Sequence, residues 1–527
     1  MSVCQPIYRI FWRIAISTAL SACLIAASGC SNSTKSAMAK GALAQSQFEA
    51  GQIWEARQTI TKAIAERDDI VELQLLHARI DLAAKSPANA FTAYSNALSL
   101  DSSNVEALLG VSQLGLQIGY LRESEDAADR ILTLDPRQQD ALIIKGLHNV
   151  IKHHYADTLA NADAILANAP TSEGGLILKA RALALLNRSD EALTVVENAR
   201  KASGDSRGVG MTLLELYRQR GDGPAMVAEL ERLRKSSAND YSLDIDEANT
   251  LYKLSDIPRA RAILRHLIFD QKLDDAGAIA VTSLWKEYDP APLDTNALAE
   301  FAAKTGMPAR KAVARYFLDR NDPIHANAAL LGAPPIDDIV ALRAQISIAQ
   351  GKLDEGLGQA RAILQRDQTH CDALVAKAQV DVARGRADDA ITASQVAVSS
   401  CPQLITANLV LARAHKIRGS REGVGIAFRD GFERNSQDSD LTRAYTAWLE
   451  QTGQGTRALA IARRLTNNAP ALLSGWKLYL EICAKVPGSN CTTEAEAGLA
   501  VARRRFGVDP RQGERQSNGL FGRLNRK

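Results

Sequence analysis

The 527-residue chain is poor in several residue types, and each scarcity excludes a class of protein. Aromatic residues make up 5% of the chain, His occurs 8 times, and the formal net charge is only +3. A chain so close to neutrality is not suited to bulk electrostatic capture of nucleic acid, so we expect no nucleic-acid partner. Hydrophobic residues reach 46%, with Ala and Leu prominent, which favours a globular and largely helical protein.

Patterns that carry chemistry are scarce too. Gly-x-Gly occurs at 208–210, 221–223 and 423–425. None of these stretches follows a predicted strand, so none has the context of a phosphate-binding loop, and each is interpreted as an inter-helix turn or a close packing site. The pair His153-His154 has no further ligand at a suitable spacing and is interpreted as part of a turn. We therefore expect no metal, no cofactor, no small-molecule substrate and no enzymatic activity.

The first 29 residues contain no Asp and no Glu. Arg9 and Arg13 precede an apolar run, 14–27, that ends in small residues, and this layout is typical of a secretory signal. The run of 14 residues is short for a transmembrane helix, which needs about 20. A signal anchor that is never cut is the alternative interpretation.

The end of this segment resembles the cleavage site of bacterial lipoproteins, in which a Cys becomes the acylated first residue. Two Cys residues qualify. Cys23 follows Leu-Ser-Ala, which matches the usual letters slightly better, but cleavage there would leave an apolar core of only 14–20. We therefore expect a signal peptide over 1–29, a lipid with palmitate among its chains on Cys30, and a polar tether over 30–36.

Ser31 follows the Cys to which we assign the lipid, where an Asp would favour retention in the inner membrane. By resemblance to the known sorting rules, we expect an outer-membrane lipoprotein that faces the periplasm of a Gram-negative bacterium. Its membrane contact would be the lipid anchor at Cys30. Export would also place the distal Cys residues in an oxidising compartment.

The rest of the chain repeats with a period of 34 residues. Successive helical blocks begin at Gly51, Lys85, Gly119, His153 and Asn187, and each follows another helical segment. A small residue recurs within the first helices, at Ala44, Ala78, Ser112, Gly146, Ala180 and Ala248. Another recurs within the second helices, at Ala56, Ala90, Ser124, Thr158, Ala192 and Ala260. Small side chains at both places allow two antiparallel helices to pack closely.

These features resemble the tetratricopeptide repeat, a 34-residue helix-turn-helix unit, and "ALSLDSS" (97–103) and "ILTLDPR" (131–137) look like its closing segment. The chain departs from the family where the repeat has aromatic residues, since Leu, Ile or Val mostly stand there. The resemblance implies an all-α fold, namely a right-handed superhelical solenoid of helix-turn-helix hairpins in which each hairpin contacts its neighbours.

The register of the repeat divides the chain into segments. It runs through 37–270, which would hold about seven repeats, and is lost in 271–335, where we expect one or two diverged hairpins. It returns over 336–510 for four or five more repeats, with the inter-helix turns marked by Gly351, Gly385, Gly419 and Gly453. The last segment, 511–527, has five basic residues and one acidic residue, and we expect a disordered tail.

Four Cys residues lie in the second array. In the repeat model Cys371 starts the first helix of a hairpin and Cys401 ends the second, so the two lie side by side and we predict a disulfide between them. Cys483 and Cys491 flank an inserted turn, and we predict a second disulfide that staples it. Four buried free thiols are the alternative.

In tetratricopeptide superhelices the first helices line a concave face that commonly holds extended peptides or partner helices. Carried over by register, the resemblance implies that six residues point toward such a groove: Arg79, Gln113, Arg181, Asn249, Gln379 and Arg413. Arg is well suited to binding carboxylates and acidic segments. Solvated positions on amphipathic helices are the alternative for each of them.

The function that the resemblance implies is a lipid-anchored periplasmic scaffold for protein partners of an envelope assembly, such as exopolysaccharide export, secretion or pilus biogenesis. Activation of a peptidoglycan synthase is a second hypothesis. A cell-wall-cleaving enzyme with a superhelical domain is a third, and it is disfavoured because the repeats run to about Pro510 and leave only 17 residues after them.

Overall fold

The structure, a computed structural model, describes residues 33–204, 206–237, 240–270, 273–486, 488 and 490–506. The signal peptide, both candidate lipidated Cys residues and the C-terminal tail lie outside the described residues. Of the expected tether, 33–36 are described and are helical, as part of a first helix that covers 33–49. The helix includes these residues because neither Gly nor Pro interrupts the chain there.

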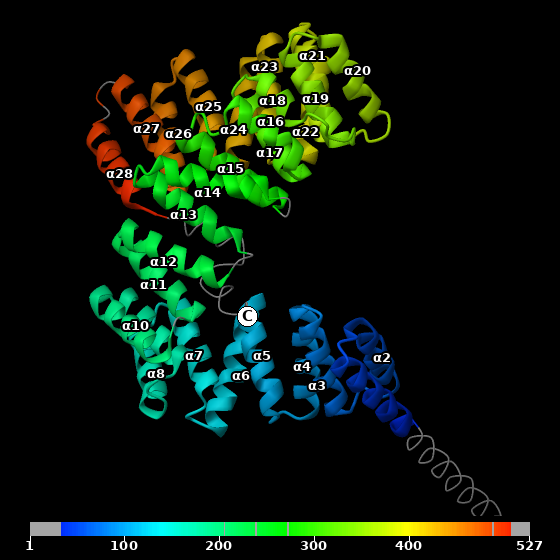
Figure 1. Ribbon diagram of the computed structural model, residues 1–527, viewed down its shortest axis with the longest axis vertical. Coiled ribbons are helices and arrows are strands. Elements are labelled where there is room, and N and C mark those ends of the chain that lie inside the picture. The colour runs from blue at the N-terminus through cyan, green and yellow to red at the C-terminus, as the bar shows by residue number, and fades with distance from the viewer. Residues whose placement is uncertain are drawn as a thin grey trace, which may run out of the picture. The chain divides into compact units, whose positions relative to one another are not determined.

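Every regular element among the described residues is an α-helix (Figure 1). The chain divides into two compact units, of which unit 1 ends at Thr212 and unit 2 begins at Leu213. The helices of unit 1 that follow 33–49 are α2 (Ile53–Glu66), α3 (Val71–Ala83), α4 (Pro87–Leu100), α5 (Val105–Ile118), α6 (Leu121–Leu134), α7 (Gln139–Ile151), α8 (Tyr155–Asn168), α9 (Glu173–Leu185) and α10 (Ser189–Ser203). Helix α11 (Arg207–Arg220) contains the point of division.

Unit 2 continues the same alternation of first and second helices. Its helices up to the end of the diverged segment are α12 (Gly223–Ser236), α13 (Tyr241–Lys253), α14 (Ile257–Phe269), α15 (Asp275–Tyr288), α16 (Thr295–Lys304), α17 (Met307–Asp319) and α18 (Pro323–Ala329). The remaining helices are α19 (Asp337–Ala349), α20 (Leu353–Leu364), α21 (Cys371–Ala383), α22 (Ala387–Ser400), α23 (Ile405–Ile417), α24 (Arg421–Arg434), α25 (Ser439–Gln451), α26 (Gly455–Asn468), α27 (Leu473–Lys485) and α28 (Thr492–Arg504).

The segment 271–335, where the sequence register is lost, is not the place where the chain divides. It forms four helices, in which α17 packs against α15 and α18, and α16 packs against α18; the last of these helices has only 7 residues. One hydrophobic core runs through it without a break, from Val227 on α12 to Ile346 on α19. The helices pack continuously because buried residues such as Trp285 and Phe301 fill the core, although the spacing of the repeats has changed.

The small residues of the two helices in a hairpin meet each other. Ser124 donates a hydrogen bond to the carbonyl oxygen of Ser112, 12 residues earlier, at 2.5 Å. Thr158 donates in the same way to the carbonyl of Gly146 at 3.2 Å. The side chains of Ala44, Ala56, Ala78, Ala90, Ala180, Ala192, Ala248 and Ala260 are fully buried. A hydroxyl that touches the backbone of the facing helix leaves no room for a large side chain, which explains the recurring small residues.

The turn inside most hairpins has one residue with a left-handed backbone. Gly is at this place at Gly51, Gly119, Gly351, Gly385, Gly419 and Gly453. The same conformation occurs at Lys85, His153 and Asn187, with φ of 56°, 62° and 61°. Side chains other than Gly adopt it at some cost in free energy, so the turn is imposed by the packing of the two helices around it. His153 therefore has a structural place in a turn, as its sequence context suggested.

Helix α20 offers a matched test of this close packing. A Cβ atom added at Gly356 would lie 2.7 Å from the carbonyl oxygen of Ala344 on the facing helix, whereas one added at Gly358 would meet nothing within 4 Å. We expect Gly356→Ala to lower the free energy of unfolding by about 1–3 kcal/mol. Gly358→Ala should raise it by about 0.5–1 kcal/mol, because Ala is the better helix former. Denaturant unfolding followed by circular dichroism measures both, and a destabilisation of equal size in the two variants would contradict the packing model.

Candidate protein-interaction surfaces

The first helices form the inner row of each array. In unit 1, α5 packs near α7 and α7 near α9; in unit 2, each first helix from α13 to α27 packs near the next first helix. Apart from α16 and α18, the second helices of the described chain do not approach one another to the same extent. Because neighbouring first helices lie closer together than neighbouring second helices, each array curves with its first helices on the concave side. The surface that can surround a partner is therefore made of first helices.

The six residues predicted to face the groove all lie on first helices. Three belong to unit 1 and three to unit 2: Arg79 on α3, Gln113 on α5, Arg181 on α9, Asn249 on α13, Gln379 on α21 and Arg413 on α23. Arg79, Gln113 and Arg413 are exposed, and the other three are half-buried. Each of the six lies on a different helix, so within each unit they are separate positions along the row of first helices.

Some of these positions are used within the chain. Arg79 Nε donates to Glu106 Oε1 at 2.6 Å, and this contact raises the pKa of the Arg79 guanidinium. The same relation occurs in unit 2, where the amide of Gln345 donates to Asp372 Oδ1 at 3.3 Å. In both cases the donor directly follows the small packing residue of its first helix. The acceptor stands 27 positions later, as the second residue of the next first helix. We call this the inter-repeat contact.

The inner row of unit 1 is largely apolar. Leu109 and Leu116 stand four residues before and three residues after Gln113, so they share its face of α5. Both are half-buried, and Ile143 and Val150 take the same places on α7. Leu82, at the corresponding place on α3, is 41% exposed. Apolar side chains therefore remain accessible to solvent along the concave side of unit 1.

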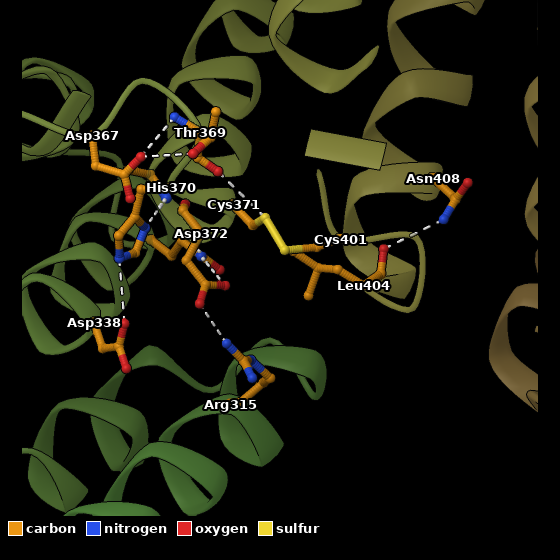
Figure 2. Close-up of a disulfide and its surroundings, with 12 residues drawn as sticks. Arg315, Asp338, Asp367, Thr369, His370, Cys371, Asp372, Cys401, Leu404 and Asn408 are labelled. Carbon is orange, nitrogen blue, oxygen red and sulfur yellow. Dashed lines mark hydrogen bonds and ion pairs between the residues drawn. A yellow bond between two sulfur atoms is a disulfide. The ribbon is translucent and has the colours of Figure 1, made fainter. Parts of the chain in front are cut away.

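The inner row of unit 2 is charged, and the sequence reasoning above did not single it out. Arg315 of α17 donates to Asp372 of α21 at 2.6 Å, next to the contact from Gln345. Figure 2 shows Arg315 and Asp372 pointing toward each other beside the bond between Cys371 and Cys401. Arg315 directly follows the buried small residue Ala314, so it stands where Arg79 and Gln345 donate the inter-repeat contact, and this position was the available signal.

Lys286 on α15 is the centre of a second charged group. It forms an ion pair with Asp440 on α25, and Asp319 and Asp438 lie near it. Desolvation raises the pKa of both Asp319 and Asp438, and the nearby Lys286 partly opposes the effect in each. The carboxylates of Asp319, Asp438 and Asp440 repel one another. The ammonium group of Lys286 attracts all three and so offsets part of this repulsion.

Both predicted disulfides are present. Cys371 is the first residue of α21 and Cys401 follows the last residue of α22, and their Cα atoms are 6.3 Å apart (Figure 2). Cys483 and Cys491 bridge the turn between α27 and α28 with Cα atoms 5.7 Å apart. Antiparallel packing places the two ends of a hairpin side by side, which is why the repeat register could indicate the first pairing.

A Gly-x-Ser-x-Gly stretch, found at the nucleophile of many hydrolases, occurs at 204–208. The structure gives Ser206 another role. Its hydroxyl accepts from the backbone N–H of Val209 at 3.1 Å, at the start of α11, and donates to Glu173 at 2.7 Å. The side chain of Ser206 thus caps a helix, and no strand precedes it in the described chain, so the context of a nucleophilic serine is not met.

Among the described residues, no group of three or more His, Cys, Asp or Glu side chains is arranged to hold a metal ion. None of their helices has both the length and the apolar composition needed to cross a membrane.

The 34-residue period, the buried small residues that meet across each hairpin, and the inner row of first helices together decide the kind of repeat. The hairpins are tetratricopeptide-like. The solenoid is all-α throughout its described residues.

Comparison with known proteins gives similarity only among solved structures. No family model and no curated protein matches the chain. PilW, a type IV pilus biogenesis factor, has a TM-score of 0.34 and 17% identity, and the match covers 39% of this chain and 96% of PilW. The pilF protein of Pseudomonas aeruginosa has a TM-score of 0.32 and 15% identity, covering 40% of this chain and 95% of its own. A TPR protein of Thermus thermophilus has a TM-score of 0.32 and 18% identity, and the match covers 34% of this chain and 99% of that protein.

The disulfides lead to a prediction about stability. Replacing both Cys371 and Cys401 by Ser should lower the free energy of unfolding by about 3–4 kcal/mol, the loop-closure value for a bridge between residues 30 positions apart. The Cys483 to Cys491 bond closes a shorter loop, so its removal should have a smaller effect. Denaturant unfolding of the oxidised protein and of each variant measures the loss of free energy of unfolding for either bond. Four free thiols in the unfolded, non-reduced mature protein would contradict both bonds.

Proposed function

We propose that the protein is a lipid-anchored periplasmic scaffold that holds protein partners of an envelope assembly. The observation that carries the proposal is the accessible apolar row on the concave side of unit 1, from Leu82 to Leu116 and Val150. Apolar surface that stays accessible on a folded protein typically marks an interaction site. A concave row of this kind suits an amphipathic partner helix or an extended segment that carries apolar side chains.

Three sequence features support the proposed location. The N-terminal signal ends in a candidate lipobox, and an anchor on Cys30 would hold the array near the membrane surface. Two disulfides suit an oxidising compartment, which the periplasm is and the cytosol is not. Ser31 favours the outer membrane by resemblance to the sorting rules.

The assembly itself is proposed by analogy with other tetratricopeptide lipoproteins. Exopolysaccharide export, secretion and pilus biogenesis are the settings that we propose first, because lipid-anchored repeat proteins of this kind serve there as assembly factors. Activation of a peptidoglycan synthase is the second proposal. Release of muropeptides by the purified protein would overturn both and support an enzyme.

The choice of the anchoring Cys can be tested directly. We expect Cys30→Ala to abolish lipid attachment and to release the protein from the membrane fraction, because acylation requires the thiol. Cys23→Ala should leave the protein lipidated and membrane-bound. Cell fractionation with mass spectrometry of the N-terminal peptide measures both outcomes, and the opposite pattern would move the anchor to Cys23.

The proposed binding surface can be tested by in-cell crosslinking followed by identification of the partners. Leu82→Glu places a charge on the concave side of unit 1, and we expect it to reduce partner recovery at least tenfold. Leu134→Glu is the matched control, because Leu134 is 57% exposed at the end of the second helix α6, outside the inner row. Equal recovery with both variants would contradict a site on the concave side. Recovery of an exporter, a secretin or a pilus component would support the first proposal, and a murein synthase the second.

A further inference from the structure

Unit 2 contains contacts between its first and its last hairpins. Lys253, the last residue of α13, donates from Nζ to the carbonyl oxygens of Ala471 at 3.0 Å, Ala502 at 3.2 Å and Arg505. These acceptors lie 218 to 252 residues further along the chain. Ala502 and Arg505 lie at the C-terminal end of α28, where the backbone carbonyls carry partial negative charge and suit an ammonium group.

Helix α15 supplies two more contacts of the same kind. Glu287 accepts a hydrogen bond from the backbone N–H of Ser474 at 2.8 Å. Ser474 is the second residue of α27, where an N–H has no acceptor within its own helix. The adjacent Lys286 pairs with Asp440, the second residue of α25. The contacts of Lys253, Lys286 and Glu287, which we call the closure, bring the start of unit 2 against its end.

Asp440 is the residue of the closure that has an alternative partner. As the second residue of a first helix, it stands where Glu106 and Asp372 accept the inter-repeat contact. The donor of that contact stands 27 positions earlier, which for Asp440 is Arg413, directly after the small residue Ala412. Arg413 is exposed and has no ion pair within the described residues, while Asp440 pairs with Lys286. Two cations are thus available to one carboxylate.

We propose that unit 2 alternates between a closed form, in which Asp440 pairs with Lys286, and an open form, in which Asp440 pairs with Arg413. The exchange replaces one solvent-accessible ion pair by another, so the two forms differ by little in that interaction. Asp319 and Asp438 also lie near Lys286; they attract its ammonium group but repel the carboxylate of Asp440, so they oppose the closed pairing in part. Opening frees Lys253, Lys286 and Glu287 from their contacts with the end of unit 2 and leaves these three side chains available to a partner. This equilibrium does not depend on the scaffold function or on its partners.

The backbone N–H of Ser474 reports the state of the closure. In the closed form its acceptor is Glu287. In the open form the N–H faces water, since the first turn of a helix offers it no acceptor. Hydrogen exchange of the full mature chain, read by mass spectrometry on a short peptide that contains Ser474, therefore measures the population of the open form.

Two substitutions should shift this exchange in opposite directions. Lys286→Gln removes the closed-form partner of Asp440, and exchange at Ser474 should become about two- to fivefold faster, as expected for the loss of one accessible ion pair. Arg413→Gln removes the open-form partner, and exchange should become slower by a similar factor. Lys286→Arg keeps the charge and should restore the exchange rate of the unmodified protein.

Arg464→Gln is the matched control, because Arg464 pairs with Glu433 at 2.6 Å between two second helices, and it should leave exchange at Ser474 unchanged. Opposite shifts for Lys286→Gln and Arg413→Gln support the proposal. No change in either variant, or faster exchange in both, overturns it. If Lys286→Gln does not fold, Arg413→Gln decides alone: slower exchange supports the proposal, and an unchanged or faster rate overturns it.

Discussion

The close approach of two helices at a pair of small residues is the contact on which the rest of this protein depends. Where Ser124 and Thr158 donate to the backbone of the facing helix, the two helices of a hairpin are in direct contact. The buried small residues that permit this approach recur every 34 residues in both helices of the hairpins. In the stacked hairpins the first helices lie closer together than the second helices, so each array curves and acquires a concave side. Every surface considered above is a consequence of this geometry.

The two units use the same geometry to present different chemistry. On the concave side of unit 1, Leu109 and Ile143 take positions next to the small residues, and the surface is apolar. In unit 2, Arg315 and Lys286 stand on the corresponding face, and they pair with Asp372 and Asp440. An apolar row can bind a partner by burying its side chains. A row of ion pairs can bind one only if ion pairs within the unit are broken and replaced by ion pairs with the partner. Apolar side chains thus remain accessible on the concave side of unit 1, whereas charged side chains of unit 2 already pair within the unit.

Prediction from the sequence succeeded where the information is local or periodic. The spacing of Ala78 and Ala90 indicated a hairpin of two antiparallel helices. Cys371 and Cys401 stand at the two ends of such a hairpin, which lie side by side, so their pairing could be predicted. The division of the chain was not predictable in the same way. The register is lost in 271–335, but the core is continuous there, because packing depends on the volume of side chains such as Trp285 and not on repeat length.

The helical period, the places where two helices touch and the pairing of the four distal Cys residues follow from the amino-acid sequence, because each depends on neighbours within about one repeat. The partners of the inner residues follow only from the three-dimensional packing. Arg79 meets Glu106 of the next repeat, whereas Asp440 meets Lys286 on a helix more than four repeats earlier. The second contact depends on the curvature accumulated over many hairpins. Small rotations at each small-residue contact add up to bring distant helices together, and no single repeat encodes that sum.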